Sequence, residues 1–372
     1  MQFVSPALKN VIFPVLSRMG YFRHRAGAGP ADAAPAIVTY HGVFPRDYEI
    51  KNRALDGNLV YGLSLRRQLQ LLTNDYHVIA PSDFLRWLEA KISLPPRSVL
   101  LTCDDALQNT LTEMLPILQE FKVSCLFFAT GASAGEGSSM LWYEELYRML
   151  LQAPRPIRLV IPDCQLELGP VAHEQLHGCW WNLVERFSQF ERAARRSLLD
   201  EVRSQVGLTP DWAERFDRNA ATSSRFLMLN RKGLRQLAAA GMEIGAHSMS
   251  HPILSRAGED IAWQEISESK LVLEEALGKS VWAFGYPFGN AATVSPRDVG
   301  LAERAGFRCA FLNVGGGFGA KVRVSHNSRF AFPRVHVTAD MTVPEFEAHL
   351  SGFYRWIRER TTGVDETAFL KT

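Results

Sequence analysis

The sequence predicts an α/β fold in which parallel strands are covered by helices. Short apolar runs rich in Val, Ile, Leu and Phe alternate along the chain with segments of helical periodicity. These runs are continuously apolar, which is typical of strands that are buried on both faces of a parallel sheet. From the residues alone, the fold is either an α/β barrel or an open α/β sheet.

The first half of the chain contains four predicted strands with helices between them. The strands are AIVTYHGV (36–43), HVIAP (77–81), SVLLTCDD (98–105) and VSCLFFAT (123–130). Leu65, Leu69 and Leu72 lie on one face of a predicted helix over 63–76. SDFLRWLEA predicts a second helix with Ser82 as its N-cap, and TLTEMLPILQEF predicts a third.

The same alternation returns late in the chain. Helices are predicted over 229–241, over 261–278 with Gly278 as the terminating residue, and over DVGLAERAG. Strands are predicted over 242–247, 281–287, 307–314 and 330–337, followed by one terminal helix over TVPEFEAHLSGFYRWIRERTTG.

One long segment does not follow the alternation. Two helical stretches flank IRLVIPDCQLELG, which predicts a β-hairpin. We therefore expect a mostly helical insertion at 132–225 within an α/β domain made of 36–131 and 226–350. Residues 1–35 are expected to form an N-terminal helix and linker, and 351–372 a C-terminal helix and tail.

Composition and charge exclude several classes of protein. The chain of 372 residues is 47% hydrophobic and has a net charge of +2, so we expect a globular protein and no nucleic-acid partner. The five cysteines include no C-x-x-C pair, which favours reduced, buried thiols over a disulfide framework. They are Cys103, Cys125, Cys164, Cys179 and Cys309.

The N-terminal apolar residues do not form a continuous run. Lys9, Asn10, Pro14 and Arg18 interrupt them, so we expect neither a signal peptide nor a transmembrane span. A surface helix is the first interpretation, and an amphipathic helix on a membrane surface is the alternative. The expected location is the cytoplasm or the inner membrane face.

Polar side chains stand where the predicted strands end. His41 ends the first strand, and Asp104 and Asp105 end the third. His247 ends the strand 242–247, and His251 follows four residues later. Functional sites of parallel α/β folds form at the carboxyl ends of the strands, so these side chains are expected to meet at one rim.

The residue types in this cluster suit a metal ion. Adjacent carboxylates repel each other unless a cation or a proton lies between them, although Asp105 could instead cap the next helix. His247 and His251 are either polar loop residues or half of a metal site. One carboxylate and two imidazoles leave coordination positions open, which is the layout of a catalytic site.

These segments resemble the polysaccharide deacetylase family, the NodB-homology carbohydrate esterases. LTCDDA (101–106) resembles the motif T-F-D-D-G, and GAHSMSHPILS (245–255) resembles H-[ST]-x-x-x-H. WAFGYPFGN (282–290) resembles the F-A-Y-P-[YF]-G variant of the third motif, and RFAFPRVHV resembles the late P-R strand. TYHGV resembles the Y-H-x-V strand of members whose repeat order is circularly shifted, and LWYEEL begins an insertion similar to that of some bacterial members.

The resemblance implies a distorted (β/α) barrel of about seven parallel strands and a divalent metal, usually zinc. It implies that Asp105, His247 and His251 bind the metal. Asp104 would be the general base, His41 the general acid, and the backbone N–H of Phe288 an oxyanion donor. The implied reaction removes N-acetyl groups from an amino sugar in a bacterial polysaccharide or glycan precursor.

Three positions depart from the family pattern. Cys103 replaces Phe, Ala106 replaces Gly, and Gly285 stands where many members carry an arginine that orients the base. If position 106 requires a positive φ, alanine strains the turn. Arg334 and His336 are further candidates at the end of the last strand.

Two rival functions share this scaffold. One is hydrolysis of a non-sugar amide or imide, and the other is carbohydrate binding by a catalytically decayed site. Retention of both aspartates and both histidines argues against decay. Either stacking on sugar rings or packing in the core of the insertion would explain Trp142, Trp180 and Trp181.

Overall fold

The computed structural model describes residues 8–27, 34–50, 52–154, 156–212, 219–319 and 328–366. Within these residues seven parallel strands form a closed ring, because the first strand pairs with both the last strand and β3. The fold is therefore a barrel, as the resemblance implies, and not an open sheet. In ring order the strands are β1 (Ala36–Tyr40), β10 (Phe332–His336), β9 (Cys309–Gly315), β8 (Ala283–Gly285), β7 (Glu243–Ala246), β4 (Leu126–Ala129) and β3 (Ser98–Cys103).

An eighth strand lies outside this ring. β2 (His77–Ile79) pairs with the first residues of β3, on the same edge that pairs with β4 further along. The strands of the ring are buried along most of their length, which explains their continuous apolar sequences.

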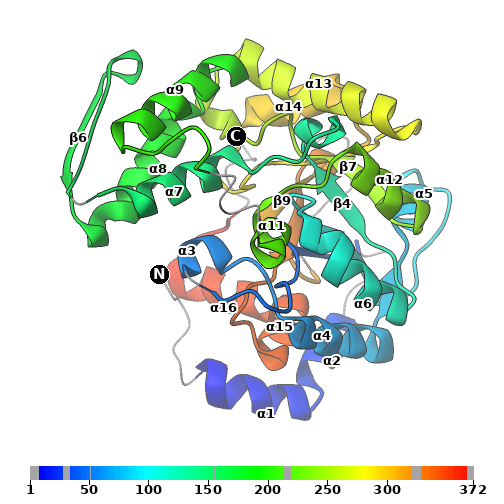
Figure 1. The fold of residues 1–372 in the computed structure, drawn as a ribbon. Helices are drawn as coiled ribbons and strands as arrows, with labels where there is room; N and C mark the ends of the chain where they lie inside the picture. Colours follow the sequence, from blue (N-terminus) through cyan, green and yellow to red (C-terminus); the bar gives the residue numbers. More distant parts are fainter. Residues whose placement is uncertain are drawn as a thin grey trace.

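Helices surround the barrel (Figure 1). Leu65, Leu69 and Leu72 are buried on one face of the 62–75 helix, as their spacing predicts. Gly278 ends the long 259–277 helix in a left-handed conformation, which confirms its predicted role. The helices are α3 (Arg53–Asp56), α4 (Gly62–Asp75), α5 (Pro81–Leu88), α6 (Leu115–Glu120), α12 (Arg231–Ala239), α13 (Glu259–Leu277), α14 (Pro296–Arg304), α15 (Val343–Leu350) and α16 (Phe353–Thr362).

Two local predictions, the N-cap at Ser82 and the unbroken terminal helix, are wrong. Ser82 is not an N-cap, because α5 begins at Pro81, whose fixed φ suits the first helical position. The predicted helix over 110–121 is present, as a π-helical turn (Thr110–Met114) that runs directly into α6. The terminal helix is broken at Gly352 (φ +71), where a Cβ would lie 2.3 Å from the carbonyl oxygen of Phe318.

The segment between β4 and α12 adds a second packed unit beside the barrel. Its helices pack around their own apolar core, and the hairpin projects away from the barrel (Figure 1). The predicted hairpin is formed by antiparallel strands. The elements are α7 (Trp142–Gln152), β5 (Ile157–Ile161), β6 (Leu166–Val171), α8 (Leu176–Phe187), α9 (Arg192–Gln205) and α11 (Ala220–Phe226).

The N-terminal residues form two short helices on the outside of the barrel. A π-helical turn (Leu8–Ile12) leads into α1 (Phe13–Arg18), and α2 (Tyr21–Gly27) follows. Residues 28–33 of the predicted linker and 367–372 of the predicted tail lie outside the described residues. Among the described helices, none has the length and apolar character needed to cross a bilayer. All five cysteines are free and buried.

Candidate active site

A left-handed turn after β3 brings two adjacent carboxylates to the same rim. The backbone N–H of Asp104 still donates to the carbonyl of Tyr40 on β1 (2.9 Å). Asp105 and Ala106 then adopt φ values of +69° and +46°. Adjacent side chains on a regular strand would point to opposite faces, so this turn is what lets both aspartates face the site. Ala106 occupies the strained conformation that its sequence position suggested.

The two histidines lie on a loop that follows β7. His247 continues the strand pairing through its N–H to the carbonyl of Ala129 (2.8 Å). Ser248 and His251 both have φ +61°, so the segment is not a helix, in agreement with the proline that follows it. The N–H of His251 donates to the Ser248 hydroxyl (2.9 Å), which closes the loop.

The carbonyl of Gly285 fixes the orientation of His247. It lies 2.7 Å from Nδ1 of that ring. Because a carbonyl oxygen only accepts, Nδ1 carries the proton and Nε2 keeps its lone pair. A backbone carbonyl that accepts from the other ring nitrogen commonly orients histidine ligands of metals in this way.

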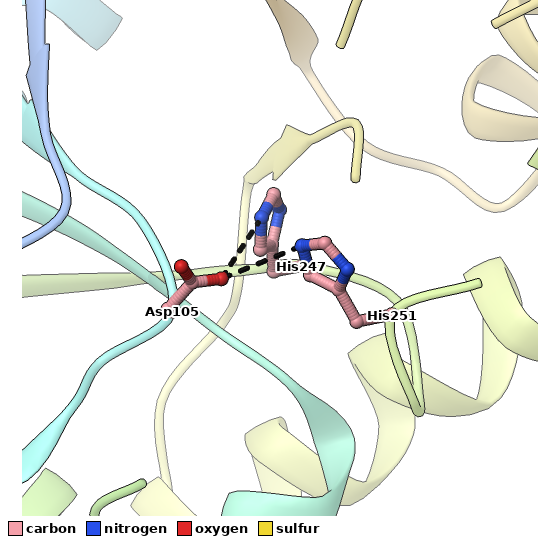
Figure 2. Close-up of side chains that lie close together, drawn as sticks. All are labelled: Asp105, His247 and His251. Carbon is pink, nitrogen blue, oxygen red and sulfur yellow. Dashed lines mark ion pairs between the residues drawn. The ribbon is translucent and has the colours of Figure 1, made fainter. Parts of the chain in front are cut away.

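Asp105, His247 and His251 converge as Figure 2 shows. Oδ1 of Asp105 lies 3.7 Å from Nε2 of His247 and 3.4 Å from Nε2 of His251. Their ligand atoms all lie within 4.8 Å of one another, and the three residues are buried. Within the described residues, Oδ1 of Asp105 has no hydrogen-bond partner.

The electrostatics of these three groups suit a cation. Burial, and then the charge of Asp104, raises the pKa of Asp105 well above its usual range. Burial lowers the pKa of His247 and of His251, so both rings are neutral ligands at neutral pH. A buried carboxyl with an unsatisfied oxygen beside two neutral imidazoles is a donor set that fits a divalent metal ion.

Asp104 has a different partner. Arg334 of β10 makes a two-pronged contact with it, Nη1 to Oδ1 at 2.7 Å and Nη2 to Oδ2 at 2.6 Å. Both side chains are buried. Although burial acts in the opposite direction, the guanidinium holds the pKa of Asp104 well below its usual range. Asp104 is therefore ionised and fixed in orientation.

Position 285 has no room for the arginine that many members of the resembled family carry there. A Cβ on Gly285 would lie 2.9 Å from Cγ of Phe128 and 3.1 Å from Nδ1 of His247. Arg334 instead contacts Asp104 from a different strand, β10. The sequence offered a signal for this pairing, because an arginine inside an apolar buried strand requires a buried acid.

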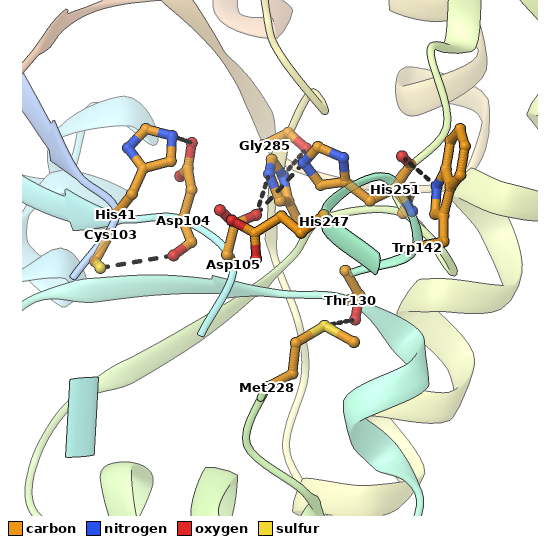
Figure 3. A network of polar contacts seen from close by, with 12 residues as sticks. His41, Cys103, Asp104, Asp105, Thr130, Trp142, Met228, His247, His251 and Gly285 are labelled. Carbon is orange, nitrogen blue, oxygen red and sulfur yellow. Dashed lines mark hydrogen bonds and ion pairs between the residues drawn. The ribbon is translucent and has the colours of Figure 1, made fainter. Parts of the chain in front are cut away.

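His41 lies on the far side of Asp104 from the metal-ligand cluster (Figure 3). Its Nε2 is 3.8 Å from Oδ2 of Asp104, and its ring centroid is 4.8 Å from that of His336. Burial, and then the charge of His336, lowers the pKa of His41 to about 3. Burial likewise lowers the pKa of His336 to about 4. Both rings are thus neutral at neutral pH.

Phe288 lies in the turn after β8 with φ +58°. Its ring packs on His251 at a centroid distance of 4.7 Å and on Tyr143 at 5.2 Å. Its backbone N–H donates to no other group in the described part of the chain. That N–H is therefore free to bind a ligand oxygen.

A cavity of about 870 Å³ is lined by the two aspartates, the four histidines, Phe288 and Arg334. The second unit supplies an aromatic wall of Tyr143, Trp180 and Trp181. Trp180 is almost fully buried, whereas Trp181 is only partly buried. Trp142 does not line the cavity. It belongs to the core of the second unit.

The second unit also holds the histidine loop through three hydrogen bonds that the sequence did not reveal. Nε1 of Trp142 donates to the carbonyl of His251 (3.1 Å), as Figure 3 shows. The N–H of Ile253 donates to the Ser188 hydroxyl (2.9 Å). Nη1 of Arg195 donates to the Ser250 hydroxyl (2.7 Å).

Residues 209–310 match the family model described as polysaccharide deacetylase. This range contains both histidines of the cluster and the turn that bears Phe288. Over this range the chain is similar to the polysaccharide deacetylases. The matched domain is accordingly that of a hydrolase acting on carbon–nitrogen bonds other than peptide bonds. A search of curated proteins found no match.

Solved structures show the same fold at low sequence identity. The Streptococcus pyogenes deacetylase PplD in complex with acetate has a TM-score of 0.51 and 15% identity, over 84% of this chain and 96% of that one. A polysaccharide deacetylase from Bacillus cereus, BC0361, has a TM-score of 0.51 and 14% identity, over 85% and 68%. IcaB from Ammonifex degensii has a TM-score of 0.50 and 17% identity, over 86% and 98%.

Proposed function

We propose that this protein removes N-acetyl groups from an amino sugar in a bacterial polysaccharide or glycan precursor, and that it uses zinc. The observation that carries the proposal is the buried cluster of Asp105, His247 and His251 beside an ionised Asp104. The pKa of Asp105 is raised, which suits this carboxylate to bind a cation, whereas the pKa of Asp104 is lowered, which keeps it ionised and able to accept a proton.

Asp105, His247 and His251 would hold the metal and leave coordination positions free for other ligands. A divalent ion there would acidify water and polarise the amide carbonyl. The Gly285 carbonyl keeps the lone pair of His247 on Nε2, the nitrogen nearer to Asp105.

Asp104 is the proposed general base. It takes a proton from the attacking water while Arg334 holds the carboxylate in position. The backbone N–H of Phe288 donates to the carbonyl oxygen as negative charge develops on it.

His41 is the proposed route of that proton to the leaving nitrogen. Since its pKa is about 3, neutral His41 must gain a proton before it can act as an acid. The nearest source is Asp104, 3.8 Å away, once that carboxylate has taken the proton from water. His41 then donates to the nitrogen as the C–N bond breaks, and acetate and a free amine remain.

The cavity suits a saccharide. Trp181 offers a flat apolar face for stacking on a sugar ring. The cavity also offers polar groups: Oδ1 of Asn313 and Nε2 of His336 are buried, belong to residues that line the cavity, and have no hydrogen-bond partner among the described residues. Hydroxyl groups of a sugar would satisfy both atoms.

The test measures metal content and acetate release together. We expect the purified protein to contain zinc and to release acetate from N-acetylated saccharides but not to open cyclic imides. Asp104→Asn is expected to lower turnover by about a hundredfold or more with metal still bound, whereas Asp105→Asn is expected to lose the metal. Asp298→Asn is the matched control, because Asp298 is also a buried aspartate paired with an arginine.

Other outcomes would overturn specific parts of the proposal. Imide or simple amide hydrolysis without saccharide deacetylation would replace the substrate class. Turnover that survives in Asp104→Asn would remove Asp104 as the base. Metal content that survives in Asp105→Asn would refute the assigned ligand set.

A further inference from the structure

The N-terminal helices leave an apolar face uncovered. Val11 is 61% exposed, Val15 50% and Met19 76%, and these three residues are four apart along one helical face. Ile12, at 44% exposed, lies beside them. We call Val11, Ile12, Val15 and Met19 the N-terminal apolar face. Figure 1 shows that α1 lies at the periphery of the molecule.

The opposite side of the same helices is firmly packed. Phe13 is fully buried, with its ring centroid 6.0 Å from that of Phe22 and 6.3 Å from that of Phe353. The hydroxyl of Ser17 donates to Glu347 of α15 (2.5 Å), and Lys9 pairs with Glu345 (2.5 Å). These contacts hold the N-terminal apolar face outward in a fixed orientation.

The charged residues of the N-terminal helices themselves are all basic. Residues 8–27 contain Lys9, Arg18, Arg23 and Arg25 but no aspartate or glutamate. Arg18, which directly precedes Met19, is exposed. Lys9 pairs with Glu345 and Arg23 pairs with Asp75, so Arg18 and Arg25 supply the basic charge beside the face. Exposed apolar side chains beside such basic residues are the pattern of a helix that lies in the headgroup region of an anionic bilayer.

An interfacial aromatic residue lies next to the same helices. Trp356 of α16 is 38% exposed, and the guanidinium of Arg25 lies 5.5 Å from its ring centroid. Arg360, also exposed, lies 4.6 Å from the same ring. Tryptophan beside arginine is favoured where apolar chains meet phosphate headgroups.

We propose that the N-terminal apolar face docks the protein onto an anionic membrane surface. Since no described helix could cross a bilayer, the attachment is peripheral. The cavity that holds the candidate active site is also lined by Lys9 of the same N-terminal segment and by Tyr354 and Arg358 of the adjoining C-terminal helix. Resting on the proposed function, docking of this segment on a membrane assigns a lipid-attached saccharide as the substrate.

Vesicle binding by the full chain, measured without substrate, tests the proposal. The protein is expected to sediment with vesicles of phosphatidylcholine and phosphatidylglycerol, more weakly with phosphatidylcholine alone, and less in high salt. The triple variant Val11→Ser, Val15→Ser, Met19→Ser is expected to bind anionic vesicles at least about tenfold more weakly. Arg18→Glu is expected to reduce the preference for the anionic lipid.

Matched controls come from exposed apolar residues elsewhere. Leu63→Ser and Leu271→Ser replace side chains that are 59% and 64% exposed, and vesicle binding should not change. Circular dichroism of each variant reports whether it is folded.

Equal vesicle binding by the wild type and a folded triple variant would overturn the proposal, as would no binding by either. A concentration-dependent dimer that the triple variant abolishes, without vesicle binding, would identify a second copy of the chain as the occupant and also overturn it. Because no catalytic step enters the measurement, a failure of the proposed function would not change these readouts.

Discussion

Asp104 and Asp105 are neighbours in the chain but have opposite electrostatic environments. Arg334 lowers the pKa of Asp104, whereas burial and the charge of Asp104 raise the pKa of Asp105. This separation of the two pKa values depends on the left-handed turn at Asp105 and Ala106, because the turn directs the two neighbouring carboxylates toward different partners. Five of the nine non-glycine residues with positive φ in the described chain lie in the site loops, where strain of this kind is commonly found.

Arg334 is predicted to set the pH dependence of activity. Without its charge the pKa of Asp104 should rise, so the acid limb of the rate profile should move to higher pH. We expect kcat/KM of Arg334→Met to fall about a hundredfold at neutral pH. Arg334→Lys keeps the positive charge, so its kcat/KM is expected to lie between the values of Arg334→Met and the wild type. A pH–rate profile measures both effects.

Arg297→Met is the control for this series, because Arg297 pairs with the buried Asp298 away from the site. An acid limb that stays in place in Arg334→Lys and in a folded Arg334→Met would contradict the role of Arg334.

At the scale of elements, the helices of the second unit are part of the candidate metal site. Trp142 of α7, Ser188 directly after α8 and Arg195 of α9 each make one hydrogen bond with the loop that carries His251. Arg195 of α9 is buried, and it contacts Ser250, which also bonds to Glu265 of α13. The histidine loop is thus fixed between the second unit and the barrel.

Arg195→Gln is predicted to weaken metal binding. The loss of the Ser250 contact should loosen the loop and raise the Kd for zinc about tenfold, as the loss of hydrogen bonds that position metal ligands commonly does. Competition with a chromophoric chelator measures this Kd, and saturating zinc should restore most of the activity. Arg196→Gln is the control, since Arg196 is the next residue and pairs with Glu145 at the surface. Equal Kd values for the two variants would exclude a role of the Arg195–Ser250 hydrogen bond in metal binding.

At the scale of the whole molecule, ring closure gathers several histidines in a buried, neutral state. Burial lowers the pKa of His41 to about 3, of His336 to about 4 and of His349 to about 3. In the unfolded chain each histidine has its ordinary pKa near ~6.5. Between about pH 4 and ~6.5 the unfolded state therefore binds more protons than the folded state.

Acid is accordingly predicted to destabilise the metal-free protein. Its free energy of unfolding should fall as the pH drops from ~6.5 toward ~4, by up to about 1.4 kcal/mol per pH unit for each such histidine. Urea denaturation of chelator-treated protein at a series of pH values measures this slope. His349→Phe should make the slope shallower, and His24→Asn, a change of an exposed histidine, should not. A midpoint that is constant or rises in acid would contradict the prediction.

The sequence by itself determined the parts of this protein that depend on near neighbours in the chain. The alternation of apolar runs and helical periodicity, the hairpin near residue 160 and the polar residues at strand ends are local patterns, and the structure contains them. Local patterns also misled where a single proline or glycine decided an element boundary, as at Pro81 and Gly352.

Only the tertiary structure decided the features that join distant segments. Closure of the barrel depends on β1 pairing with β3 and β10, and the orientation of Asp104 depends on an arginine 230 residues away. The contacts that hold the histidine loop come from three separate positions in the second unit, Trp142, Ser188 and Arg195. Such contacts are set by the packing of the whole chain, because neither periodicity nor local propensity specifies which distant side chain will be the partner.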